Sequence, residues 1–68
     1  MLLNVENMSC QHCVNSVTRA LQALDATARV SVDLASKQVH AQGNFSAEAA
    51  IAALNDADYP ATLISNES

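Results

Sequence analysis

The chain has few of the residues from which large enclosed active sites are built. Its 68 residues include no tryptophan, one tyrosine, one phenylalanine, one glycine and one proline. Half of the residues are hydrophobic, but alanine is the commonest of them, so the core must be built from a few Leu, Val and Ile side chains. A chain of about 60 residues buries only about 60% of the surface that its unfolded form exposes. The sequence predicts a single small domain, residues 1–68, without an elaborate enclosed active site.

Positive charge is also scarce. Three Lys and Arg residues stand against seven Asp and Glu residues, for a formal net charge of −4. Binding to a phosphate backbone depends on clustered Lys and Arg side chains that displace counterions. Three scattered bases cannot form such a patch, so the sequence argues against nucleic acid as a partner. An acidic surface instead favours a basic docking face on a protein partner.

Long hydrophobic runs are missing as well. The apolar start Met1-Leu2-Leu3 is interrupted by Asn4 and Glu6 and has no basic region before it, so it does not resemble a signal peptide. No run approaches the roughly 20 apolar residues that span a bilayer. The two cysteines, with no others to pair with, do not form the disulfide framework of a secreted miniprotein. We therefore expect a cytoplasmic protein with reduced thiols and no membrane insertion.

The first half of the chain shows a strand pattern followed by a helix pattern. In residues 2–6, Leu3 and Val5 fall on one face, which is the period of a half-buried strand. After the second cysteine, apolar residues recur at spacings of three and four, which predicts one stripe of a helix that ends near Asp25. The predicted stripe consists of Val14, Val17, Leu21 and Leu24.

The second half predicts a hairpin, a helix and a final strand. Residues 29–34 and 38–42 both alternate and are separated by the polar turn 35–37; the inward residues are Val30, Val32, Leu34, Val39 and Ala41. Ser46 is a suitable helix N-cap, with Glu48 in the first turn and Phe45 placed to pack on Ala50.

This second helix is expected to bury Ile51 and Leu54 and to end by Asp58. Pro60 then permits an edge strand that carries residues 62–64. The predicted order is strand, helix, strand, strand, helix, strand. It matches an α+β, ferredoxin-like βαββαβ fold, a four-stranded antiparallel sheet with both helices on one face.

The segment Met8-Ser9-Cys10-Gln11-His12-Cys13 carries the unusual chemistry of the chain. Thiolates are soft donors, and two of them about one helical turn apart can converge on one soft ion such as Cu(I). Cys13 lies at the start of the predicted helix, where unpaired N–H groups and the positive end of the dipole favour a thiolate. We therefore expect Cys10 and Cys13 to bind a metal, with a lowered pKa at Cys13.

The number and position of the available ligands argue against several other uses of a Cys-x-x-Cys motif. Structural zinc sites usually need four protein ligands, and iron–sulfur clusters normally need four cysteines. Covalent haem attachment needs a histidine directly after the second cysteine, where this chain has Val14. A redox dithiol stays open, because thioredoxin-like motifs also place Cys-x-x-Cys at a helix start.

Met8–Cys13, the order of elements around it and Asp58-Tyr59-Pro60-Ala61 together resemble a heavy-metal-associated domain of the bacterial copper-chaperone kind. The resemblance covers essentially the whole chain. The sequence departs from the family pattern in three places: Asn7 and Asp58 replace glycines, and Asp25-Ala26-Thr27-Ala28 replaces a Gly-Val after the first helix.

The resemblance implies a carrier without catalytic activity. Such a carrier binds Cu(I) and passes it, by exchange of thiolate ligands, to a copper-transporting P-type ATPase or to a copper-responsive regulator. The resemblance also places Tyr59 beside the metal loop. A tyrosine at this position resembles the bacterial copper-binding branch of the family. Au(I), Ag(I), Hg(II) and Zn(II) stay open as alternative ions, and a metal-bridged homodimer stays open as an alternative assembly.

Three further side chains near the motif each have more than one possible role. His12 could be a third ligand, bridge two molecules, or tune the charge from outside the metal's ligand set. Met8 could add a thioether ligand but is better explained as an anchor of the loop in the core. The phenol of Tyr59 could bond to a cysteine sulfur, or its ring could fill the end of the core. His40, on the polar face of its strand, is expected to have no role.

Overall fold

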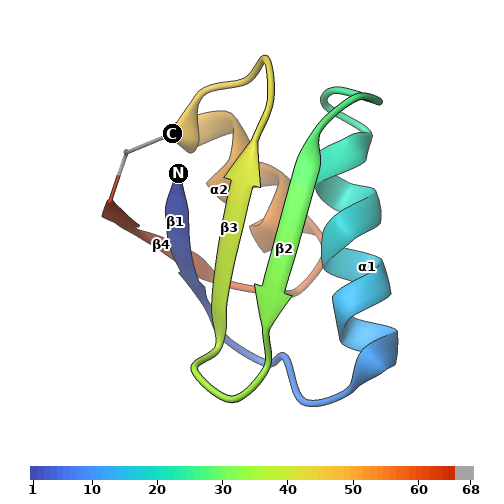
Figure 1. The fold of residues 1–68 in the computed structure, drawn as a ribbon, viewed down its shortest axis with the longest axis vertical. Helices are drawn as coiled ribbons and strands as arrows, with labels where there is room; N and C mark the ends of the chain where they lie inside the picture. The colour runs from blue at the N-terminus through green and yellow to red at the C-terminus, as the bar shows by residue number, and fades with distance from the viewer. Residues whose placement is uncertain (66–68) are drawn as a thin grey trace.

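The computed structural model describes residues 1–65, which form six elements in the order βαββαβ (Figure 1). Their bounds are β1 Leu2–Val5, α1 Gln11–Gln22, β2 Arg29–Asp33, β3 Gln38–Gln42, α2 Ala47–Asp56 and β4 Ala61–Ser65. The predicted order of strands and helices is confirmed.

The strands form one sheet in the order β2-β3-β1-β4, and every neighbouring pair is antiparallel. Leu3 of β1 lies opposite Val39 on one side and Leu63 on the other, so β1 is central and β4 is an edge. Val5, the last residue of β1, lies opposite Ala61, the first residue of β4. This register places the loop that follows β1 next to the loop that precedes β4.

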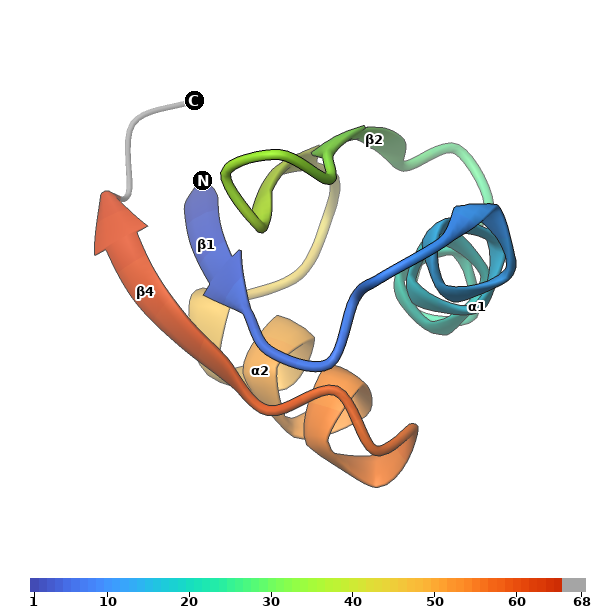
Figure 2. The same ribbon diagram turned by 90° about the horizontal axis from the view of Figure 1, so that it is seen from below.

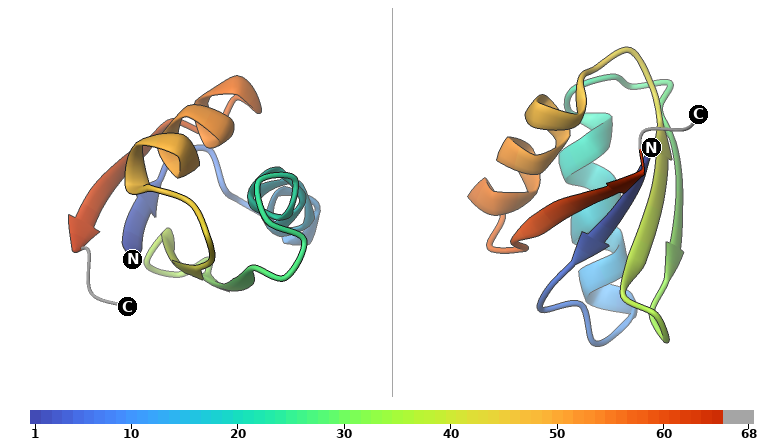
Figure 3. Two further views of the ribbon diagram at one scale, coloured as in Figure 1. Left: turned by 90° about the horizontal axis from the view of Figure 1, so that it is seen from above. Right: turned by 90° about the vertical axis from the view of Figure 1, so that its left-hand side faces the viewer.

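Both helices cover the same face of the sheet, as the edge-on views show (Figures 2 and 3). The loop from β1 to α1 crosses the lower end of the molecule in Figure 1, and the turn between β2 and β3 lies at the same end. The two-layer, ferredoxin-like arrangement predicted from the sequence is therefore confirmed.

The core lies between the sheet and the helices and is built from small and medium-sized side chains. In β1, buried Leu3 and Val5 alternate with half-buried Leu2 and Asn4, as the period of a strand requires. The buried cluster consists of Met1, Leu3, Val5, Met8, Val17, Leu21, Val39, Ala41, Ala50, Leu54 and Ala61. Phe45 and Tyr59 are partly buried against it.

Two residues assigned to the buried face lie outside it. Leu24 is 41% exposed because α1 ends at Gln22, so the expected helical stripe stops at Leu21. Leu34 is 36% exposed because β2 ends at Asp33 and the turn begins there. The predictions for these two side chains were wrong, and in both cases the element ends earlier than its apolar pattern.

The start of α2 follows the prediction closely. The Ala49 N–H donates to Ser46 Oγ at 3.1 Å, and Glu48 lies in the first turn. Ala50 and Leu54 are fully buried, whereas Ile51 is half-buried. The second helix is thus capped by its own sequence and attached to the core through one face.

Neither α1 nor α2 is long and apolar enough to cross a lipid bilayer, and this holds for the whole of residues 1–65.

Candidate metal centre

Met8 anchors the loop that carries the cysteines to the hydrophobic core. This side chain is 2% exposed and belongs to the buried cluster, which agrees with its expected role as an anchor. Ser9 and Cys10, which follow it, are exposed. The chain therefore leaves the core at Met8 and presents the next residues to solvent.

Cys10 and Cys13 lie at the start of α1 with their sulfur atoms 3.8 Å apart. Cys10 is the N-cap residue, with an extended backbone and an exposed side chain, whereas Cys13 lies in the first turn and is partly buried. The backbone N–H groups of Cys13 and Val14 donate to the Cys10 carbonyl at 3.1 and 3.2 Å. Both cysteines are free thiols, so the helix begins between two sulfur atoms that face each other.

The N-terminus of α1 has neither a side-chain cap nor an acidic residue in its first turn. The first N–H groups of a helix have no partners within it, and together with the dipole they favour negative charge nearby. In α1, no carboxylate or hydroxyl of the first turn uses this property. A thiolate at this position is therefore electrostatically favoured.

The pKa of Cys13 is lowered from the ordinary value of 9.0 to about 6. The largest cause is hydrogen bonding with the Tyr59 hydroxyl, followed by a backbone hydrogen bond with Ser9 and by contributions from Cys10. Partial burial acts in the opposite direction. At neutral pH Cys13 is therefore mainly a thiolate. The lowered pKa agrees in direction with the prediction from the helix position, although its largest cause is the Tyr59 hydroxyl.

Tyr59 reaches the site from the loop before β4. Its ring packs against the buried cluster, and its hydroxyl interacts with Cys13 and Ser16. The contact with Cys13 is the main cause of the raised pKa of the phenol, which favours its protonated, donating form. The two readings of Tyr59 therefore describe two ends of one side chain, with the ring on the core and the hydroxyl at the sulfur.

The structure does not bring His12 together with the two cysteines. Within residues 1–65, no group of three or more His, Cys, Asp or Glu side chains is arranged to hold a metal ion. The His12 side chain is exposed, and its carbonyl accepts a hydrogen bond from Ser16 Oγ at 3.2 Å. Two thiols without a third protein ligand suit a soft ion of low coordination number.

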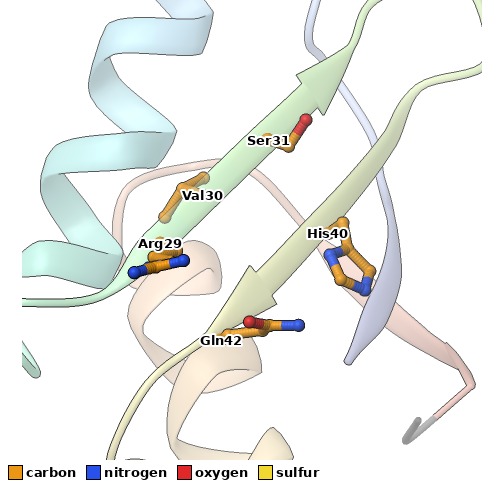
Figure 4. A pocket seen from close by; sticks show the side chains of 5 residues that line it. All are labelled: Arg29, Val30, Ser31, His40 and Gln42. Atoms are coloured by element: carbon orange, nitrogen blue, oxygen red, sulfur yellow. The ribbon is translucent and has the colours of Figure 1, made fainter. Parts of the chain in front are cut away.

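His40 lies away from the site. It is opposite Leu2, at the end of β1 farthest from the cysteine loop. Its exposed side chain lines a shallow hollow on the open face of β2 and β3 with Arg29, Val30, Ser31 and Gln42 (Figure 4). This placement agrees with the expectation that His40 takes no part in the metal site.

Two residues beside the site were recognised in the sequence only as departures from the family pattern. Asn7 and Asp58 have left-handed backbones, with φ of 68° and 70°. Asn7 Nδ2 donates to the Asp58 carbonyl at 3.2 Å and thereby joins the cysteine loop to the loop of Tyr59. Asn and Asp tolerate left-handed φ better than other residues with side chains, and this preference was the available signal.

Comparison with known proteins places these features in a family. Residues 2–60 match the model of the family described as "Heavy-metal-associated domain". A protein named copper chaperone CopZ from Staphylococcus aureus is 39% identical over 56 residues, which cover 82% of this chain and 81% of that protein. The CopZ of Staphylococcus haemolyticus is 47% identical over 38 residues, and that match spans only 56% of each protein.

A solved structure is similar over nearly the whole chain. The copper chaperone Atx1 from Synechocystis PCC6803 superimposes with a TM-score of 0.88 and 35% sequence identity. The match covers 91% of this chain and 98% of that one. The likeness therefore extends to the fold as a whole.

Proposed function

The chain belongs to the heavy-metal-associated domain family of bacterial copper chaperones, and from this premise we propose that it carries Cu(I) between Cys10 and Cys13. The proposed carrier works in the cytoplasm, without catalysing a reaction, and binds one ion and hands it to another protein. Met8 supports the loop from the core, and Tyr59 supports the Cys13 thiolate.

The observation that carries this proposal is the 3.8 Å separation of the two sulfur atoms at the exposed start of α1. Metal–thiolate bonds are about 2.3 Å long for zinc, and twice that length exceeds the separation. One ion of similar size can therefore contact both sulfurs without movement of the backbone. Soft thiolate ligands favour Cu(I) over hard cations.

The two cysteines are suited to different steps. Cys13 is mainly a thiolate at neutral pH, so an arriving ion does not have to displace its proton. Cys10 is the more exposed sulfur and is the natural point of entry and exit. The first contact can form at Cys10, and the ion then settles between both sulfurs.

Transfer follows from the low coordination number. An ion held by two thiolates has room for a third, so a partner's thiolate can bond to Cu(I) before a bond to Cys10 or Cys13 breaks. The copper stays Cu(I), and the released cysteine is a thiolate that can take up a proton. The partners that fit are a copper-transporting P-type ATPase and a copper-responsive regulator. A second copy of the chain, bridged by the metal through the same exposed loop, is a further partner of this kind.

The same geometry supports a preference among metals. Ag(I), Au(I) and Hg(II) are soft ions and share the affinity of Cu(I) for thiolates. Zn(II) usually takes four ligands, and the described residues offer no group of three. We therefore expect Zn(II) to bind weakly to the monomer.

The test is an anaerobic titration of the reduced protein with Cu(I) against a competing chromophoric chelator, with Zn(II) in parallel and the oligomeric state followed by light scattering. We expect one tightly held Cu(I) per chain or per pair of chains. Failure to compete for Cu(I) would overturn the proposal. Catalytic reduction of a disulfide substrate without metal would then support the redox dithiol instead.

A further inference from the structure

A hydrogen bond from a side chain to the backbone joins the two loops of the site. Asn7 Nδ2 donates to the Asp58 carbonyl at 3.2 Å, across 51 positions of sequence. Close by, the Glu6 N–H donates to the Pro60 carbonyl at 2.8 Å. The residue after Asn7 is the anchor Met8, and the residue after Asp58 is Tyr59. The Asn7 bond thus lies directly between the cysteine loop and the tyrosine loop.

Both partners have a backbone conformation that glycine adopts without strain. The φ angles of 68° and 70° lie in the left-handed region, which is unfavourable for most residues that have a Cβ. Glycine at position 7 would provide the same turn but no donor. Asparagine tolerates the left-handed turn and in addition supplies the amide that reaches Asp58.

The peptide unit between Asp58 and Tyr59 is held at both of its ends. Its carbonyl, which belongs to Asp58, accepts from Asn7, and its N–H, which belongs to Tyr59, donates to the Leu54 carbonyl at 2.8 Å. A peptide unit is planar, so two hydrogen bonds, one to its carbonyl and one from its N–H, fix its orientation. This orientation in turn sets the direction in which the Tyr59 side chain leaves the backbone.

We propose that Asn7 is a positioning residue of the metal site, which keeps the Tyr59 hydroxyl at the Cys13 sulfur by holding the Asp58 carbonyl. Asn7 itself does not touch the metal. It acts through Tyr59, whose ring packs against the buried cluster and whose hydroxyl interacts with Cys13. The consequence for copper rests on the proposed function, whereas the placement of Tyr59 belongs to the metal-free protein.

The first measurement needs no metal. Tyr59 is the only tyrosine and the chain has no tryptophan, so nuclear Overhauser contacts and emission of the phenol report on this one side chain. Asn7→Gly keeps the left-handed turn and removes the amide, and Asn7→Asp keeps the shape but replaces the donor with an acceptor. We expect both variants to weaken the contact between the Tyr59 ring protons and the Cys13 β-protons.

The matched control is Asn4→Thr. It removes another exposed hydrogen bond donated by a side-chain amide, from Asn4 Nδ2 to Glu6 Oε1 at 3.1 Å. This hydrogen bond joins residues only two positions apart and does not reach the tyrosine loop. Thr also suits the strand in which Asn4 lies. We expect this variant to leave the contact between Tyr59 and Cys13 unchanged. Unchanged contacts in both Asn7 variants would overturn the positioning role.

The second measurement asks whether Asn7 acts through the phenol. Loss of one neutral hydrogen bond should weaken Cu(I) retention in Asn7→Gly by about threefold in competition with a chelator. In a Tyr59→Phe background the same substitution should have no further effect. Equal losses in both backgrounds would contradict the inference. A wild-type protein that fails to bind Cu(I) would overturn the proposed function, while a weakened contact between Tyr59 and Cys13 would still support the positioning role.

Discussion

The two helices of this small domain begin in opposite ways. At the start of α2, Ser46 Oγ accepts the Ala49 N–H at 3.1 Å, and Glu48 adds negative charge to the first turn. At the start of α1, Cys10 occupies the same N-cap position but makes no side-chain cap, and the first turn holds no acid. The start of α2 is therefore capped by its own side chain, whereas the start of α1 has no side-chain cap.

The difference shows how a short chain can build a site without a cavity. Unpaired N–H groups and the positive end of a helix attract negative charge wherever a helix begins. In α2 a serine and a glutamate use this attraction for stability. In α1 two sulfurs stand at the same place, and the attraction acts on the Cys13 thiolate. The proposed metal site is therefore a helix start that lacks the usual side-chain cap.

The largest expected effect comes from removing both sulfurs from α1. Replacing Cys10 and Cys13 together with serine should abolish stoichiometric Cu(I) binding and leave the circular dichroism spectrum unchanged. Ser46→Ala, which alters the other helix start, should bind Cu(I) as the wild type does. Chelator competition on all three proteins provides the check. Retained binding in the double variant would show that the metal lies elsewhere.

The next effect concerns the lowered pKa of Cys13 at the start of α1. Because the pKa of Cys13 is about 6 in the folded chain and ordinarily 9.0, the unfolded chain binds more protons between these values. The stability of the metal-free protein should therefore rise with pH across this window, and the contribution should be lost as the pH falls through about 6.

Urea unfolding as a function of pH measures this dependence, with Cys13→Ser as the control that should lack it. In Tyr59→Phe the midpoint of Cys13 alkylation should move to higher pH, because the largest cause of the lowered pKa is gone. An unchanged midpoint in that variant would contradict the role given to the phenol.

A smaller effect is expected at α2. Ser46→Ala removes the hydroxyl that accepts the Ala49 N–H and should lower the free energy of unfolding by about 1 kcal/mol. Urea denaturation of the metal-free protein measures the difference. A variant as stable as the wild type would mean that water caps α2 equally well.

The smallest effect is a gain in stability. Cys10→Ser places a good cap residue at the uncapped start of α1 and should stabilise the metal-free fold by about 0.5 kcal/mol while weakening Cu(I) binding. Stability changes of opposite sign for Ser46→Ala and Cys10→Ser in urea would confirm that α2 is capped by its side chain and α1 is not. A destabilised Cys10→Ser protein would show that Cys10 also supports the loop.

The elements of this fold were predictable because each carries a simple period. Leu3 and Val5 alternate into the core, and Val17 and Leu21 fall on one face of α1. The ends of elements were less predictable, since Leu24 and Leu34 continue an apolar pattern after the backbone has already turned. Periodicity reports which face is apolar, whereas the last residue of an element depends on caps and turns.

The same division holds for the site. The positions of Cys10 and Cys13 at a helix start followed from the motif and the pattern after it, and a resemblance to a family placed Tyr59 nearby. The hydrogen bond between Asn7 and Asp58 could not be predicted from the sequence. It joins residues 51 positions apart, and their contact depends on the register of β1 and β4. Such contacts require the assembled sheet.

The measurement that tests the central claim most directly is copper K-edge X-ray absorption of the wild-type protein loaded anaerobically with Cu(I). The account predicts Cu(I) coordinated only by sulfur, from Cys10 and Cys13, and no histidine nitrogen. Loss of this signal in Cys10→Ser/Cys13→Ser would complete the assignment. Nitrogen or oxygen ligands in the wild type, or an unchanged spectrum in the double variant, would contradict a metal site made by the uncapped start of α1.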